Sequence, residues 1–130
     1  MSYPKRSDPF AEFYGEFADR LRGDRWQPDV DVYETPTDVL VRVEIAGVRS
    51  EDVRVTVDGD VLRISGVRAS HDAARVERLH QMEIAAGPFE RRVRISVPFE
   101  RERVTAHLAD GFLTVSLGKK ARKTVEVSAE

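Results

Sequence analysis

The side chains that could act as acids, bases or metal ligands show no spacing typical of a catalytic or metal site. His71, His80 and His107 do not form H-x-x-x-H or a comparable ligand pattern. Cysteine is absent, which excludes a thiolate nucleophile and a cysteine-bound zinc ion. No glycine-rich phosphate motif and no G-x-S-x-G motif occurs either. We therefore expect three surface histidines, no enzyme, no metal and no cofactor, in a protein that acts through its exposed surface.

The composition favours one folded domain with short extensions. Of the 130 residues, 41% are hydrophobic and 34% are charged, which suits a buried core under a solvated exterior. The net charge of -2 provides no basic field for nucleic acid. The N-terminus has charges and prolines where an export signal needs an apolar run, and no run approaches the roughly 18 apolar residues that span a bilayer. We expect a soluble, cytoplasmic protein that binds neither nucleic acid nor membranes.

The first 24 residues have a helical hydrophobic period. Asp8 and Pro9 form a helix start signal, and large apolar side chains follow at spacings of three and four. These side chains are Phe10, Phe13, Tyr14, Phe17 and Leu21. So short a helix is barely stable alone, so its apolar stripe must contact another surface. That surface is either the protein's own core or another chain.

Downstream of Trp26 the hydrophobic period becomes two, which is typical of strands with one buried face. Arg91 lies on the otherwise apolar face of its segment. Tight turns are predicted at Asp58-Gly59-Asp60 and at Asp110-Gly111. The alternating segments are 38–45, 52–58, 61–65, 89–97, 104–108 and 112–117. Short strands without long helices between them predict an antiparallel β-sandwich and exclude a parallel α/β fold.

The charged segment between Val67 and Gly87 interrupts this alternation, and a loop of that length usually has a function. It either folds over the protein itself or projects, so that residues near Val76 to Met82 form a strand completed by a second subunit.

A basic run follows Leu117, and its composition favours a solvated tether over a binding patch. Beyond it, Val125 and Val127 would point to the same side of an extended chain and could enter paired pockets at a sheet edge.

Two motif clusters resemble the α-crystallin domain of small heat shock proteins, in its bacterial type. Trp26-x-Pro28 with Asp31 and Glu34 is similar to the opening of that domain. The end of the domain is matched by Phe89, Arg91, Ile95, Ala106, Gly111 and Leu113. Val125 and Val127 stand in the place of the family's C-terminal I-x-I.

The resemblance implies an immunoglobulin-like sandwich over residues 25–118, an N-terminal arm over 1–24, a dimerisation loop within 68–87 and a C-terminal extension over 119–130. It also implies an ATP-independent holdase chaperone that binds unfolded clients and forms a homodimer by strand exchange, with assembly into a larger oligomer left open. The stripe in the arm would bind clients. The dimer interface would contain Val76, Arg78, Leu79, His80, Met82 and Arg91. Val125 and Val127 would anchor in a groove lined by Val53, Val55, Val57, Val104, Ala106 and Leu108.

Two other classes share a sandwich architecture. A co-chaperone of the p23 type would form a defined complex with one chaperone, and an extracellular carbohydrate-binding or adhesion module would bind glycans. The V-x-V tail and the donated segment argue against the first, while the missing export signal and the single tryptophan argue against the second.

Overall fold

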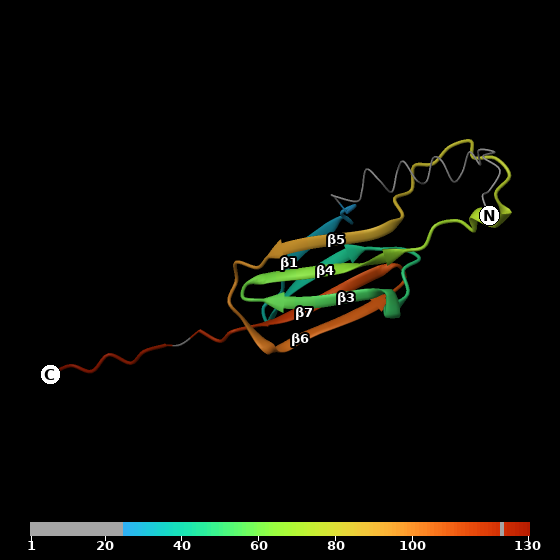
Figure 1. Cartoon of the computed structure of the whole chain (residues 1–130). Helices are drawn as coiled ribbons and strands as arrows, with labels where there is room; N and C mark the ends of the chain where they lie inside the picture. The colour runs from blue at the N-terminus through green and yellow to red at the C-terminus, as the bar shows by residue number, and fades with distance from the viewer. Residues whose placement is uncertain (1–24, 123) are drawn as a thin grey trace.

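Two antiparallel sheets form the domain in the computed structural model, which describes residues 25–122 and 124–130 (Figure 1). One sheet has the strand order β1-β2-β7-β6 and the other has β3-β4-β5. The strands are β1 (Val30–Glu34), β2 (Asp38–Glu44), β3 (Val53–Asp58), β4 (Val61–Arg68), β5 (Gly87–Arg94), β6 (Phe99–Ala109) and β7 (Phe112–Lys119). A 3₁₀ turn, η1 (Ser50–Asp52), precedes β3, and a second one, η2 (Ala73–Arg75), lies in the loop between β4 and β5. The named strands all pair antiparallel, so the predicted all-β sandwich is confirmed.

The core lies between the sheets and is built from the alternating side chains of the central strands. Successive residues of a strand point to opposite faces, so a period of two places every second side chain inside. Phe89 of β5 is fully buried and contacts the core residues of both sheets. The strand contributions are Val39, Val41 and Val43 from β2, Leu62 and Ile64 from β4, and Leu113, Val115 and Leu117 from β7.

Both predicted hairpin turns form. Asp110 and Gly111 have φ angles of 53° and 83°, and two consecutive positive φ angles are what a type I′ hairpin turn requires. Gly59 has a φ of 62° in the turn between β3 and β4. These turns fix the registers Leu108↔Leu113 and Asp58↔Val61.

The structure differs from the sequence prediction where the chain crosses from one sheet to the other. The strand expected over 89–97 ends earlier, at Arg94. The Ile95 amide still donates to the Asp60 carbonyl at 2.7 Å, one position beyond the Val61↔Arg94 pair, and the chain then turns toward the other sheet. Pro98 has no amide hydrogen to donate, and β6 begins directly after it, earlier than the expected start at residue 104. The register of β6 against β7 shifts between Phe99 and Val104, so this strand contains an irregularity that simple alternation does not show.

Residues 26–29 connect one edge of each sheet. The Glu90 amide donates to the Trp26 carbonyl at 3.2 Å, and Arg91 Nη1 donates to the Pro28 carbonyl at 3.2 Å. The chain then enters β1, so β1 and β5 lie on the same side of the sandwich (Figure 1). The other two edge strands, β3 and β6, therefore share the opposite side.

Candidate functional site

The apolar side chains of the two edge strands β3 and β6 lie on one side of the sandwich, and together they are named here the seam between β3 and β6. On β3, Val53, Val55 and Val57 are half-buried and pack against the core. On β6, Val104 and Leu108 do the same, whereas the small Ala106 between them is exposed. The six residues predicted for the groove therefore lie on two edge strands that share one side of the domain, and the groove itself stays a prediction.

The two valines predicted to fill that groove are outside it in the single chain. Val125 is 69% exposed and Val127 is 90% exposed. Figure 1 shows residues 124–130 extending away from the sheets. Two β-branched side chains, two residues apart, are thus exposed near the end of the C-terminal extension.

The strand β1 forms a second free edge. It pairs with β2 on one side only, through the register Val32↔Val41. Val32 is 50% exposed and Tyr33 is 46% exposed. An edge strand with unpaired backbone groups and exposed apolar side chains is a template for a further strand.

The loop between β4 and β5 contains the residues predicted for dimerisation. Val76, Leu79 and Met82 are half-buried, whereas Arg78 and His80 are exposed. Residues 76–82 form no strand in the single chain. The predicted strand was to be completed by a second subunit, so its formation stays a prediction.

The base of this loop is held by Arg68, a residue that the sequence analysis did not single out. Its Nε and Nη2 atoms donate to the Ala85 carbonyl at 3.0 and 2.8 Å, and Nη1 donates to the Ala46 carbonyl at 3.3 Å. The guanidinium carbon lies 4.4 Å from the centre of the Trp26 ring, a cation–π contact. Trp26 also donates its indole N–H to the Gly87 carbonyl at 3.0 Å. These contacts join the two ends of the loop to the segment that enters the domain.

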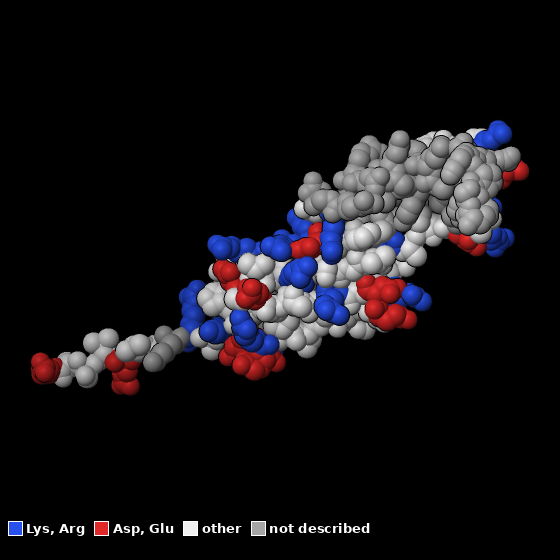
Figure 2. Space-filling view, viewed as in Figure 1, with Lys and Arg blue, Asp and Glu red and all other residues white. Residues whose placement is uncertain are grey.

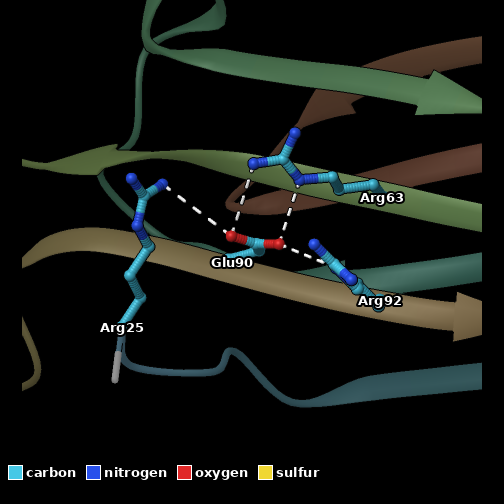
Figure 3. A network of polar contacts seen from close by, with 4 residues as sticks. All are labelled: Arg25, Arg63, Glu90 and Arg92. Carbon is cyan, nitrogen blue, oxygen red and sulfur yellow. Dashed lines mark hydrogen bonds and ion pairs between the residues drawn. The ribbon is translucent and has the colours of Figure 1, made fainter. Parts of the chain in front are cut away.

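Glu90 lies beside this cluster and accepts from several arginines at once (Figure 3). Arg63 donates Nε to Oε2 at 3.0 Å and Nη2 to Oε1 at 3.4 Å, and Arg92 donates Nε to Oε2 at 2.9 Å. Arg25 Nη1 is 3.9 Å from Oε1. The hydrogen bonds from Arg63 and then Arg92 lower the pKa of Glu90 below its usual value.

Arg91 is half-buried on the face that contains Phe89 and Val93. The sequence pattern also places Arg91 on this otherwise apolar face, and its Nη1 atom donates to the Pro28 carbonyl. Whether Arg91 also contacts a second subunit stays a prediction.

The three histidines are exposed, and the described part of the chain has no group of three or more His, Asp or Glu side chains that could hold a metal ion. Within the same residues no helix is long and apolar enough to cross a membrane. The predicted client-binding residues Phe10, Phe13, Tyr14, Phe17 and Leu21 lie outside the described residues.

Residues 31–128 match the family model described as "Hsp20/alpha crystallin family". The chain belongs to this family. It is 33% identical over 144 residues to the 16.9 kDa class I heat shock protein 3 of Oryza sativa subsp. japonica, and the match covers 99% of this chain and 97% of the relative. It is 34% identical over 146 residues to the 16.9 kDa class I heat shock protein 1 of Triticum aestivum, with the same coverage. These relatives are plant proteins, so the predicted bacterial type is not borne out.

Solved small heat shock proteins have the same fold. Heat shock protein 16.0 from Schizosaccharomyces pombe matches with a TM-score of 0.68 at 30% identity, over 81% of this chain and 99% of that one. A small heat-shock protein from Xylella fastidiosa matches with a TM-score of 0.71 at 25% identity, over 82% and 97%. Small heat shock proteins are non-enzymatic chaperones that act under stress, bind unfolded clients and form oligomers.

Proposed function

We propose that this small heat shock protein is an ATP-independent holdase, which binds partly unfolded proteins and suppresses their aggregation under heat or other stress. The observation that carries the proposal is the match of residues 31–128 to the Hsp20/alpha crystallin family, and the apolar surface that one chain leaves uncovered supports it. The β1 edge exposes half of Val32 and nearly half of Tyr33, and both valines of the tail are exposed. Unfolded proteins aggregate through apolar surface and unpaired strand edges, so a chain with the same features can bind them instead.

The charged exterior would keep such a complex dissolved. Figure 2 shows basic and acidic side chains interspersed over the face formed by β3, β4 and β5. Mixed charges of this kind oppose association between complexes without creating a strong field of one sign. Holding a client needs no work cycle, so the proposal requires neither nucleotide nor metal. We also propose that the protein is cytoplasmic, because cytosolic proteins rarely contain disulfides and this chain has no cysteine.

Clients would bind to the N-terminal arm, residues 1–24, through Phe10, Phe13, Tyr14, Phe17 and Leu21. The proposed domain spans residues 25–118 and the extension spans 119–130. In this division the sandwich provides the scaffold, and the two extensions provide apolar side chains for other chains.

Dimerisation would occur by strand exchange through the loop within residues 68–87. The segment from Val76 to Met82 of one subunit would add to the free β1 edge of the other, in the manner of β-strand addition. A single chain cannot form this pairing, which agrees with the absence of a strand over 76–82. The tail valines, Val125 and Val127, would enter the seam between β3 and β6, either in their own dimer or in a neighbouring one.

The test is a light-scattering assay of a heat-stressed model protein without ATP, combined with mass determination by size-exclusion light scattering. We expect scattering to fall as this chain approaches an equimolar ratio to the model protein, and we expect a mass of at least two subunits. Unchanged scattering at that ratio would contradict the holdase proposal. A mass of one subunit would contradict the proposed dimer.

A further inference from the structure

Arg68 is the last residue of β4, and it contacts the loop at its far end. The register pairs Arg68 with Gly87, so these two residues form the neck from which residues 69–86 leave the domain. At this neck the Arg68 side chain holds the Ala85 carbonyl with two hydrogen bonds and the Ala46 carbonyl with one. The end of the loop is thereby tied to the connection between β2 and β3.

All three nitrogen atoms of the Arg68 guanidinium donate a hydrogen bond. Nε and Nη2 form a fork on one carbonyl, and Nη1 reaches a second carbonyl. The flat face of the group covers the Trp26 ring. A lysine could donate to one of these carbonyls, but it has neither the fork nor the planar face.

Trp26 binds the other side of the neck, at Gly87, the first residue of β5. Its indole N–H donates to the Gly87 carbonyl, and its ring centre is 5.2 Å from that of Phe89, which is fully buried. The tryptophan is therefore anchored on the core and presents a fixed surface to the guanidinium. Arg68 and Trp26 together form a clamp, named here the neck clamp.

We propose that Arg68, supported by Trp26, is the positioning residue of the dimerisation loop: the neck clamp fixes the direction in which residues 69–84 leave the domain and so sets the strength of the dimer. This inference rests on the proposed dimerisation through Val76 to Met82. The clamp contains none of the residues proposed for the interface, and it acts through the loop that contains all of them except Arg91.

The physical reason is the conformational freedom that association must remove. Binding costs less when the binding segment is already ordered, because fewer conformations are lost at the moment of association. With Ala85 tied to the domain, the loop has fewer free residues and starts from a fixed point. Without the clamp, the loop would be held only at Arg68 and Gly87 by the backbone ladder, and its larger ensemble would weaken the dimer.

The test compares Arg68→Ala and Arg68→Lys with the matched control Arg63→Ala in the full chain. Arg63 is an arginine of the same strand, and its hydrogen bonds go to Glu90. The dimer dissociation constant is measured by analytical ultracentrifugation well below the unfolding temperature of every variant. We expect Arg68→Ala to raise it on the order of tenfold, Arg68→Lys to raise it less, and Arg63→Ala to leave it within about twofold.

Two further readouts separate positioning from general stability. Hydrogen exchange should accelerate in residues 69–86 of the Arg68 variants while the core strands stay protected. Trp26 is the only tryptophan of the chain, so its fluorescence reports directly on loss of the guanidinium from its ring. If Arg68→Ala does not fold, Arg68→Lys decides the question with the same measurements.

The outcomes distinguish this inference from the function on which it rests. If the wild type is dimeric and the folded Arg68 variants have the same dissociation constant, the inference is overturned and the proposed dimer remains. A wild-type protein that is monomeric overturns the proposed dimer, and the inference with it. Weakened dimers together with fast exchange confined to residues 69–86 support both.

Discussion

Glu90 joins three parts of the chain through one carboxylate. Its arginine partners come from β4, from β5 and from the residue that precedes Trp26. The hydrogen bonds from Arg63 and then Arg92 favour the ionised form, which is why the pKa of Glu90 is lowered. The arginine side chains remain largely exposed to water, so solvent weakens each pair.

This network predicts a pH dependence with a definite sign. Because the folded-state pKa of Glu90 is depressed, its stabilising contribution is present above the unfolded-state value of about 4.5 and is lost as pH falls through the lower folded-state value. The thermal midpoint of Glu90→Gln should therefore lie below that of the wild type at neutral pH, and the two should converge in acid. Circular dichroism melts of both proteins between neutral and strongly acidic pH measure the difference. A difference that stays constant across the range would mean that the charge of Glu90 contributes nothing.

At the scale of elements, the tail valines are proposed to bind in the seam between β3 and β6, and valine has a smaller side chain than the isoleucine of the family's I-x-I motif. Isoleucine has one methylene more, and burying a methylene is worth about 0.8 kcal/mol. We therefore expect Val125→Ile with Val127→Ile to shift the size distribution toward assemblies larger than the dimer, and the two alanine substitutions to shift it away. Mass distributions from size-exclusion light scattering at matched concentrations test this.

The matched control for the tail is Ser128→Thr, which adds a methyl group next to the valine pair without enlarging it. We expect its mass distribution to equal that of the wild type. A distribution that responds to neither the isoleucine nor the alanine pair would remove the tail from assembly.

The elements that could be predicted from the sequence are those set by local pattern. The alternation of β2, β4 and β7 and the Asp110-Gly111 turn need only the period of two and a residue pair that tolerates positive φ. The end of β5 and the start of β6 could not be predicted, because they depend on where the chain crosses between the sheets and on the register shift between Phe99 and Val104, neither of which changes the local alternation. Arg68 was missed because its carbonyl partners lie 17 and 22 residues away in sequence. The only local signal was its place at the end of a strand before a long loop.

At the scale of the whole molecule, the proposal that the sandwich forms the dimer and the arm binds clients predicts the effect of removing the arm. Among the described residues, the buried hydrophobic core extends from Val39 to Leu117, so we expect it to persist when residues 1–24 are removed. We expect the truncated chain to keep the melting behaviour and dimeric mass of the full chain and to lose client protection. Each large apolar side chain contributes about 1.5–3 kcal/mol when fully buried, so losing five should raise the half-protective concentration by on the order of tenfold or more.

Two full-length variants show whether the apolar stripe or the length of the arm is responsible. Replacing Phe10, Phe13, Tyr14, Phe17 and Leu21 with serine should reproduce the loss caused by the truncation. Replacing Glu12, Glu16 and Asp19 with serine changes the same segment without touching the stripe, and it should leave protection intact. The light-scattering assay measures all three proteins beside the wild type. Full protection by the truncated chain would place the client site elsewhere in the chain, and the exposed Val32 and Tyr33 of the β1 edge would be the first candidates.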